Sequence, residues 1–254
     1  MLVKDRIVVV TGAASGIGRA LARRFAQEGA KLVVCSDRNG DGVRAVAEEV
    51  GGIAFATDVS KEADIKHMID TVEAEQGPID LFCSNAGIGV GGGAEAPDEA
   101  WQRIWDINVM AHVWAARHMV PLMAARGEGY LLNTASAAGL LSQIGSAPYA
   151  VTKHAAVGLA EWLAITHGDK GIRVSVLAPQ AVRTAMTAGN PDGVASVDGM
   201  IEPEAVAEAC VRAIEAEDFL ILPHPEVLEY MRRKTSDYNR WIGGMRKLQR
   251  RYTG

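Results

Sequence analysis

The stretch Thr11-Gly12-Ala13-Ala14-Ser15-Gly16-Ile17-Gly18 decides the fold of this chain. It follows a run of β-branched residues at 7–10 and precedes an amphipathic segment at 17–28. A glycine-rich turn between a strand and a helix lets the backbone approach a pyrophosphate, and the helix N-terminus supplies N–H donors. Glycines alone are a weak signal, but strand, loop and helix stand here in the required order, although the spacing TGxxxGxG differs from GxGxxG. We therefore expect a dinucleotide to bind at Gly12, Ser15, Gly16, Ile17 and Gly18.

The alternation of strand and helix continues along the chain. Apolar runs predict strands at 7–10, 31–36, 53–57, 81–84, 130–134, 173–177 and 219–222. Amphipathic or apolar segments predict helices at 17–28, 41–50, 61–76, 98–125, 148–168 and 203–216. Near-continuous apolar strands are typical of a parallel sheet that is buried on both faces. The pattern predicts an α/β fold: one Rossmann-like, doubly wound domain over 1–254, with a mostly parallel seven-stranded sheet and helices on both faces.

The composition is that of an ordinary globular protein. The chain has 254 residues, of which 48% are hydrophobic and 22% charged, and this excludes intrinsic disorder. No run approaches 18 apolar residues and the N-terminus lacks a signal-peptide pattern, so we expect neither a membrane span nor export. Cys35, Cys83 and Cys210 show no metal-ligand spacing, which favours reduced thiols, no metal and a cytoplasmic location. The net charge of −5 argues against nucleic-acid binding.

The end of the second predicted strand bears on cofactor choice. Asp37 lies 19 residues after Gly18, and a carboxylate near that distance can accept hydrogen bonds from the ribose of NAD. It would repel the 2′-phosphate of NADP, whereas Arg38 would attract it. We weigh Asp37 above Arg38, because the carboxylate should stand where the phosphate would go, and so expect NAD, with NADP less favoured. Asp37 can also be interpreted as a turn or cap residue before Gly40.

Polar residues follow the later predicted strands and recur at fixed intervals. Ser136 follows the fifth strand, and Tyr149 and Lys153, four residues apart, share one helix face. A Tyr and a Lys at this spacing are ordinarily a surface pair. With the glycine loop upstream, they belong to an ordered series of motifs: TGAASGIG at 11–18, Asp37, Asp58-Val59, SNAG at 84–87, Asn108, Ser136, YAVTK at 149–153 and Pro179 to Thr184.

This series resembles the short-chain dehydrogenase/reductase family, in its single-domain branch, over roughly residues 5–223. The resemblance implies that Tyr149 is the general acid/base, that Ser136 holds the substrate oxygen and that Lys153 also binds the nicotinamide ribose. Asn108 would position a water in a proton relay, although it could simply satisfy a helix bulge. The resemblance further assigns cofactor contacts to Asp58, Val59, Asn85, Ala86, Gly87, Pro179, Val182 and Thr184, while Asp58 could instead cap the following helix.

To act as a general acid/base near neutral pH, Tyr149 needs a pKa well below that of a free phenol, which is about 10. One ammonium about 4 Å away, at an effective dielectric constant of about 20, stabilises a phenolate by roughly 4 kcal/mol. That is enough to bring the pKa close to neutrality. The spacing therefore predicts that Lys153 lowers the pKa of Tyr149.

The substrate pocket is expected between segments 89–93, 137–144, Gln180 and a mobile lid loop at 185–200. We name Ala138, Gln143, Gln180 and Met186 as pocket residues; Gln180 stands where the family usually has Gly. These walls are small or apolar, and no Arg or Lys stands at an obvious place to hold an anion. Arg183 is the nearest candidate, and it could equally face solvent. We therefore expect a bulky, uncharged, hydrophobic secondary alcohol or ketone, oxidised or reduced with NAD(H).

Two other functions remain open at this point. One is an NADPH-linked carbonyl or 3-oxoacyl reductase, and the other is a non-catalytic, NAD-sensing regulatory protein on the same fold. The joint presence of Ser136, Tyr149, Lys153 and Asn108 argues against the sensor. A sugar-nucleotide epimerase is disfavoured, because those longer relatives have a larger C-terminal substrate domain.

Within the predicted helices 98–125 and 148–168, the stretches 104–123 and 149–165 are apolar nearly all round, so one side of each needs cover beyond the sheet. We expect a homo-oligomer, a dimer or a tetramer, built on these two helices. Cover by the protein's own C-terminal segment is the alternative.

The tail at 224–254 is expected to be helical and basic. From residue 227 onward it holds eight Lys/Arg and two acids, a net +6, so the rest of the chain carries −11 within the total of −5. Trp241, Met245, Leu248 and Tyr252 form one helical stripe, which predicts docking on the same subunit or a neighbour. The basic residues favour a solvated face, with anionic partners as the alternative. Binding at a membrane surface is disfavoured, because Gly243 and Gly244 should interrupt the helix.

Overall fold

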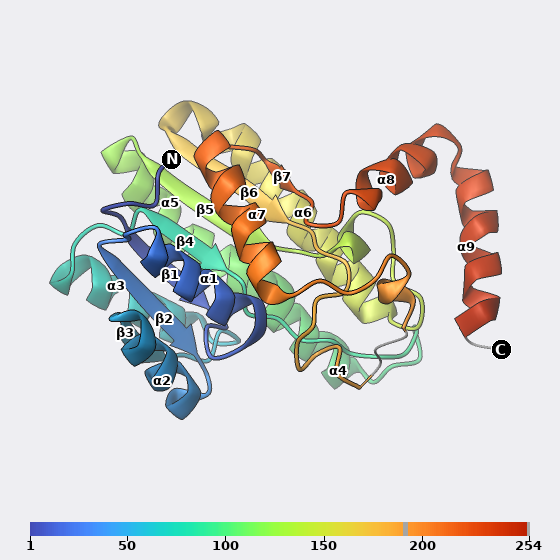
Figure 1. The fold of residues 1–254 in the computed structure, drawn as a ribbon, viewed down its shortest axis with the longest axis horizontal. Coiled ribbons are helices and arrows are strands. Elements are labelled where there is room, and N and C mark those ends of the chain that lie inside the picture. Colours follow the sequence, from blue (N-terminus) through green and yellow to red (C-terminus); the bar gives the residue numbers. More distant parts are fainter. Residues whose placement is uncertain (190–192, 253–254) are drawn as a thin grey trace.

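The computed structural model describes residues 1–189 and 193–252, which form seven parallel strands in the order β3-β2-β1-β4-β5-β6-β7 (Figure 1). The strands are β1 (Ile7–Thr11), β2 (Leu32–Asp37), β3 (Ile53–Ala56), β4 (Leu81–Ser84), β5 (Gly129–Thr134), β6 (Ile172–Leu177) and β7 (Leu220–Ile221). The α-helices are α1 (Gly16–Gln27), α2 (Gly40–Val50), α3 (Glu62–Glu75), α4 (Asp98–Trp105), α5 (Ala111–Arg126), α6 (Ala147–His167), α7 (Pro203–Ala216), α8 (Glu226–Ser236) and α9 (Tyr238–Tyr252). The predicted doubly wound fold is confirmed, and the sheet, expected to be mostly parallel, is parallel throughout.

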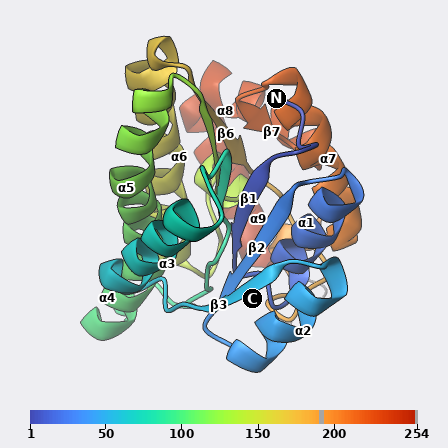
Figure 2. The same cartoon turned by 90° about the vertical axis from the view of Figure 1, so that its left-hand side faces the viewer.

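Two helical layers cover the sheet. Helices α1, α2 and α7 lie on one face and α3, α5 and α6 on the other (Figure 2). Alternate side chains of β1 enter the two cores: Val8 and Val10 pack toward α1, and Ile7 and Val9 pack on the opposite side. Because both faces are covered, the strands are apolar at almost every position, as the sequence indicated.

The predicted helix 98–125 is interrupted. Between α4 and α5 the chain makes a π-helical turn, Asp106–Met110, which contains Asn108. The Asn108 side chain accepts a hydrogen bond from the Ile88 N–H (2.9 Å) and donates one to the Ile88 carbonyl (3.0 Å). Turns of this kind are frequent at functional sites, because the extra residue re-aims one side chain without ending the helix.

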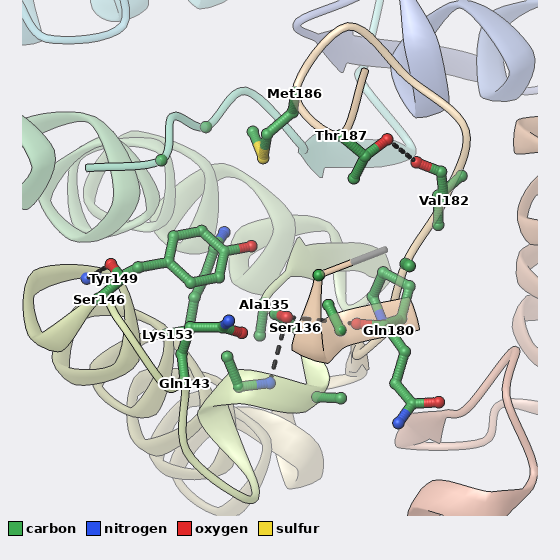
Figure 3. A pocket seen from close by; sticks show the side chains of 18 of the residues that line it. Ala135, Ser136, Gln143, Ser146, Tyr149, Lys153, Gln180, Val182, Met186 and Thr187 are labelled. Atoms are coloured by element: carbon green, nitrogen blue, oxygen red, sulfur yellow. Dashed lines mark hydrogen bonds between the residues drawn. The ribbon is translucent and has the colours of Figure 1, made fainter. Parts of the chain in front are cut away.

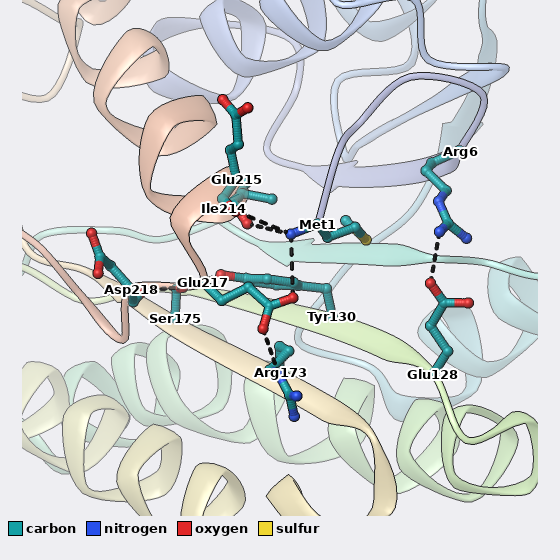
Figure 4. A network of polar contacts seen from close by, with 10 residues as sticks. All are labelled: Met1, Arg6, Glu128, Tyr130, Arg173, Ser175, Ile214, Glu215, Glu217 and Asp218. Carbon is teal, nitrogen blue, oxygen red and sulfur yellow. Dashed lines mark hydrogen bonds and ion pairs between the residues drawn. The ribbon is translucent and has the colours of Figure 1, made fainter.

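The amino ends of the strands are joined by polar contacts (Figure 4). Arg173 Nε donates to Glu217 Oε2 at 2.7 Å, which links β6 to the segment after α7. The Tyr130 hydroxyl lies 2.6 Å from Ser175 Oγ, and Ser175 in turn donates to the Asp218 carbonyl (2.6 Å). These bonds hold β5 and β6 in register at one end of the sheet. The opposite, carboxyl end is where ligands bind in open α/β sheets.

Helices α8 and α9 lie beyond the carboxyl ends of the strands (Figure 1). The expected interruption at Gly243 and Gly244 is wrong, because α9 runs unbroken through both glycines. The break falls instead at Asp237, whose carboxylate accepts a hydrogen bond from the Arg240 N–H (2.9 Å) and so caps the first turn. Because the cap fixes the start of α9, and lysine and arginine, which have good helix propensity, follow the glycines, the helix tolerates the poor helix propensity of Gly243 and Gly244.

The tail does not cover the outer surface of α6 in this subunit. Trp162 and Ile165 on that surface are 57% and 85% exposed. Cover by the C-terminal segment, the alternative to an oligomer, is therefore not what the fold has. Within residues 1–189 and 193–252, no helix is both long and apolar enough to cross a membrane.

Candidate active site

One large cleft, about 1910 Å³ in volume, opens at the carboxyl ends of the strands. It brings together every cofactor residue expected from the sequence. These are Gly12, Ser15, Gly16, Ile17, Gly18, Asp37, Arg38, Asp58, Val59, Asn85, Ala86, Gly87, Tyr149, Lys153, Pro179, Val182 and Thr184. Ser136 lines the same cleft, close to Tyr149 and Lys153 (Figure 3).

The glycine loop has a backbone that other residues would disrupt. Gly12 has φ +70°, and a Cβ there would lie 2.9 Å from the Ala86 Cα. A Cβ on Gly18 would lie 2.1 Å from the Gly12 carbonyl oxygen. Ser15 precedes α1 but makes no side-chain cap, so no side chain of the described chain occupies the first N–H groups of this helix. The loop therefore fits a pyrophosphate at the N-terminus of α1.

Thr11 and Asn85 connect the ends of three strands under the loop. Thr11 Oγ1 accepts hydrogen bonds from the backbone N–H groups of Asn85 (2.9 Å) and Ala86 (3.1 Å). The Asn85 side chain donates to the Thr11 carbonyl (3.0 Å) and accepts from Thr134 Oγ1 (3.2 Å). The SNAG segment thus holds β1, β4 and β5 together while its backbone faces the cleft.

Asp37 has both properties that the sequence left open. Its carboxylate accepts hydrogen bonds from the N–H groups of Ala14 (3.1 Å) and Asn39 (2.9 Å), which is a turn role. It also lines the cleft beside Arg38, whose side chain is exposed. A carboxylate held at the end of β2 is where an adenosine ribose is bound in folds of this type.

Asp58 makes a turn ahead of α3 rather than capping it directly. Its Oδ1 accepts hydrogen bonds from the Ser60 hydroxyl (2.7 Å) and N–H (3.1 Å). The Ser60 hydroxyl bond is the main reason that the pKa of Asp58 is lowered, and the charges of Lys61 and Arg38 add to it. Asp58 is therefore ionised at the adenosine end of the cleft, with Thr57, which the sequence analysis did not single out, beside it.

Ser136, Tyr149 and Lys153 come from the end of β5 and the first turns of α6. Ser136 Oγ donates to the Pro179 carbonyl (3.2 Å) and accepts from the Ala138 N–H (3.2 Å). Ser146 caps α6 by accepting a hydrogen bond from the Tyr149 N–H (3.3 Å), which places Tyr149 in the first turn. Lys153 Nζ donates to the Thr134 carbonyl (2.9 Å), and only 3% of Lys153 is exposed.

The charge states of this pair correct the sequence argument. Lys153 Nζ lies 5.7 Å from the centroid of the Tyr149 ring. Burial raises the pKa of Tyr149, although the Ser136 hydroxyl acts in the opposite direction, and burial lowers the pKa of Lys153 to about 8. The expected fall in the pKa of Tyr149 is wrong for this structure, because the sequence argument counted the ammonium and not the desolvation of both groups.

Asn108 differs from the other expected catalytic residues, because it does not line the cleft. It is 0% exposed and lies behind Gly87. A Cβ on Gly87 would lie 3.3 Å from Asn108 Oδ1 and 3.5 Å from Lys153 Nζ, so both polar atoms flank this glycine. The two interpretations of Asn108 are therefore compatible: it supports the π-helical turn and it stands beside Lys153.

The substrate end of the cleft is lined by the four expected pocket residues, Ala138, Gln143, Gln180 and Met186. Of the segments that should form the walls, 89–91, 137–138 and 141–144 line the cleft, whereas Gly92, Gly93, Gly139 and Leu140 do not. Residues 190–192 of the expected lid lie outside the described part of the chain. The start of that loop is held by Thr187, which donates to the Val182 carbonyl at 2.7 Å (Figure 3).

Two features of this end escaped the sequence analysis. His224, 3% exposed, follows β7 and accepts a hydrogen bond from the Gln180 N–H at Nδ1 (3.2 Å), which fixes the backbone where the family usually has Gly. The tail also reaches the cleft, and its lining residues include Tyr230, Arg233, Arg240, Trp241, Met245, Lys247, Leu248, Arg251 and Tyr252. The apolar stripe at 241–252 indicated that this helix packs on another surface, but the sequence alone does not indicate which surface. Arg183, named only as the nearest candidate for holding an anion, is exposed and pairs with Glu202 (2.7 Å).

Comparisons with known proteins agree with this geometry. A family profile described as short chain dehydrogenase matches residues 6–194. The 1-deoxy-11-beta-hydroxypentalenate dehydrogenase of Streptomyces exfoliatus is 35% identical, over 95% of this chain and 91% of that protein. Human epidermal retinol dehydrogenase 2 is 34% identical, over 90% of this chain and 77% of that protein. A short chain dehydrogenase/reductase from Burkholderia phymatum, solved in complex with NAD, superposes with a TM-score of 0.86 at 28% identity, covering 94% of this chain and 96% of its own.

The fold and the cleft thus define an oxidoreductase with a nicotinamide dinucleotide cofactor. The chain belongs to the short-chain dehydrogenase/reductase family.

Proposed function

We propose that this protein transfers a hydride between NAD(H) and a bulky, hydrophobic secondary alcohol or ketone, with Tyr149 as the general acid/base. The observation that carries the proposal is the convergence of Ser136, Tyr149 and Lys153 in the cleft that also contains the glycine loop. When bound there, a nicotinamide dinucleotide supplies the hydride acceptor for oxidation and the hydride donor for reduction.

The side chains divide the proton chemistry between them. In oxidation, Ser136 Oγ donates a hydrogen bond to the alcohol oxygen, and Tyr149 takes the hydroxyl proton as the C–H bond yields its hydride. In reduction, Tyr149 returns the proton to the carbonyl oxygen while Ser136 stabilises the charge that develops there. Both hydroxyls lie on fixed elements, Ser136 at the start of the 3₁₀ turn Ala137–Gly139 and Tyr149 in the first turn of α6.

Lys153 and Asn108 support Tyr149 from behind. The Lys153 ammonium stabilises a phenolate electrostatically, and its buried position strengthens that effect relative to water. Asn108 Oδ1 and Lys153 Nζ both lie beside Gly87, where the amide can hold a water that exchanges protons with the ammonium. Asn108 is accordingly a positioning residue in this proposal.

The cofactor preference in the proposal is NAD over NADP. The carboxylate of Asp37 lines the adenosine end of the cleft and would repel a 2′-phosphate. Arg38 is exposed beside Asp37. Its positive charge also interacts with the carboxylate of Asp58, and this interaction weakens the attraction of Arg38 for a phosphate.

We further propose a homo-oligomer assembled through α5 and α6. Trp162 and Ile165 project from α6 and are left uncovered by the rest of the subunit. Apolar residues this exposed are costly for a monomer and are typical of subunit interfaces. Size measurement at micromolar concentration tests this part, and a monomer would contradict it.

The test of the reaction follows NADH formation by near-ultraviolet absorbance. Purified protein is given a panel of hydrophobic secondary alcohols with NAD and with NADP in parallel. The proposal predicts turnover with NAD that is lost in Tyr149→Phe. Turnover with NADP alone would show that Arg38 outweighs Asp37. Tight NAD binding without turnover of any alcohol or ketone would favour a cofactor sensor instead.

A further inference from the structure

Helices α8 and α9 form an arm, residues 226–252, across the substrate end of the cleft. Lys234 Nζ on α8 donates to the Leu140 carbonyl at 2.6 Å, and the Tyr230 hydroxyl donates to Asp198 Oδ1 at 2.8 Å. Leu140 belongs to the loop after Ser136, and Asp198 belongs to the loop after Thr184. The arm is thus tied to two loops whose next residues, Leu141 and Val197, line the cleft.

One face of α9 looks into the cleft. Trp241, Met245 and Leu248 are half-buried and line it, so they offer an apolar surface to a ligand. Arg240, Lys247 and Arg251 line the cleft from the same helix. Residues at these spacings lie on adjacent strips of one helical surface, so the apolar strip is flanked by a cationic strip.

The cationic strip has no acidic partner in the described part of the chain. Arg233, on α8, pairs with Glu229 at 2.8 Å, but Arg240, Lys247 and Arg251 take part in no ion pair. The acidic residues that line the cleft lie at the adenosine end: Asp37 is the last residue of β2, and Asp58 follows β3. A concave surface with uncompensated charge of one sign concentrates ligands of the opposite sign.

The cofactor does not account for this strip. Its pyrophosphate has a separate site in the glycine loop at the N-terminus of α1. The arm is bonded instead to the loops that follow Ser136 and Thr184. The anion that meets the strip therefore belongs to the other ligand of the cleft, the substrate.

We infer that the substrate is an amphipathic hydroxy or oxo compound whose apolar body packs on Trp241, Met245 and Leu248 and whose anionic group is held by Arg240, Lys247 and Arg251. This inference rests on the proposed function, because it assigns the substrate class of the same cleft. It replaces the uncharged substrate expected from the sequence, where only Arg183 was considered as an anion contact.

The experiment uses the full chain and two matched secondary alcohols, 12-hydroxyoctadecanoate below its micelle concentration and its methyl ester. Steady-state kinetics with NAD are measured for the wild type and for Arg240→Gln/Lys247→Gln/Arg251→Gln. The matched control is Arg246→Gln/Arg250→Gln, which removes two charges from the opposite side of α9, away from the cleft. Binding of both compounds to the NADH-loaded protein is measured by calorimetry in parallel.

The triple variant should raise KM for the acid about tenfold and change KM for the ester by less than about twofold, as expected for several exposed charge pairs. The preference of the wild type for the acid should shrink in about 0.5 M salt, because exposed charges are then screened. A 3-hydroxyacyl thioester of coenzyme A forms a second arm of the test. A larger loss for this thioester than for the acid in the triple variant identifies phosphate, and not carboxylate, as the anion.

Equal KM values for acid and ester, or equal losses in the triple variant and the control, would overturn the inference and leave the proposed reaction standing. Absence of turnover with both compounds would count against the proposed function for this substrate size, and calorimetry then decides the inference separately. Acid binding that weakens in the triple variant alone supports the anion site. Acid binding that is unchanged in the triple variant overturns it.

Discussion

The cleft has two walls of different construction. The wall on the strand ends carries Ser136, Tyr149 and Lys153, with Asn108 directly behind. The side chains of Ser136, Lys153 and Asn108 are held by backbone groups at or just beyond the ends of β6, β5 and β4. The wall on the arm carries Arg240, Trp241 and their neighbours on α9, a helix without a single buried residue. The first wall has the fixed geometry that proton transfer requires, and the second can vary without disturbing the sheet.

The two walls should also respond differently to substitution. On the strand wall, burial of the Lys153 ammonium costs free energy, and the hydrogen bond to the Thr134 carbonyl offsets part of that cost. Substitutions there should therefore alter the rate and its pH dependence. On the arm, a few hydrogen bonds hold exposed side chains, so changes there should alter KM and leave the chemical step intact. Four substitutions test this division, given from the largest expected effect to the smallest.

Tyr149→Phe should have the largest effect. Removing the hydroxyl removes the proton acceptor while the ring and its packing remain, so kcat should fall by on the order of 10²–10⁴-fold, the usual range for a general acid/base. Cofactor binding, measured by NADH fluorescence, should stay within about twofold because the glycine loop is untouched. Retention of wild-type kcat would remove Tyr149 from the mechanism.

Lys153→Met should lower kcat by roughly 10²-fold and shift the pH profile. Oxidation needs the Tyr149 phenolate, and because burial raises the pKa of this phenol, oxidation should speed up as pH rises. Burial lowers the pKa of Lys153 to about 8, but the two groups titrate together: the Lys153 ammonium favours the Tyr149 phenolate, and the phenolate in turn favours the ammonium. Without the ammonium, the rise in kcat should move to higher pH. An unshifted profile would contradict the electrostatic role of Lys153.

Asp37→Ser should change the ratio of kcat/KM for NAD to that for NADP by roughly tenfold, the ratio that corresponds to about 1.4 kcal/mol of lost repulsion. The serine hydroxyl can still accept a hydrogen bond from the Asn39 N–H two residues on, so the turn should persist, although the bond from Ala14 is lost. Parallel saturation curves with the two cofactors provide the measurement. A ratio that stays at the wild-type value would assign discrimination elsewhere, with Arg38 the first candidate.

Asp237→Ala should have the smallest effect. It removes the cap of α9, and a lost cap typically costs about 1 kcal/mol of helix stability. Hydrogen exchange should therefore increase in residues 238–252, while thermal unfolding of the sheet and kcat for a small neutral alcohol remain at wild-type values. A fall in kcat would mean that the arm takes part in the chemical step.

The strand wall could be predicted from the sequence because its signals are local. The TGAASGIG turn between a strand and a helix, and the four-residue spacing of Tyr149 and Lys153, fix neighbours that the backbone itself brings together. The burial of Tyr149 and Lys153 could not be predicted from local signals, because it depends on how α6 packs on β5 and β6. That omission is why the direction of the pKa change of Tyr149 was wrong.

The position of the arm was harder to predict, because it depends on contacts between residues far apart in the sequence. Its amphipathic stripe predicted a helix, but the stripe is equally compatible with docking on a neighbour or on the cleft. Gly243 and Gly244 suggested an interruption, whereas the structure ends one helix at Ser236 and starts the next after the Asp237 cap. The bonds from Tyr230 and Lys234, which direct the arm to the cleft, join residues far apart in sequence.

The most direct test of the account compares the two walls in one assay. It measures kcat for a neutral hydrophobic secondary alcohol with saturating NAD, in Tyr149→Phe and in Arg240→Gln/Lys247→Gln/Arg251→Gln. The account predicts that kcat is lost in the first variant and stays at the wild-type value in the second. Full kcat in Tyr149→Phe, or loss of kcat in the arm variant, would contradict the separation of chemistry and substrate recognition between the walls.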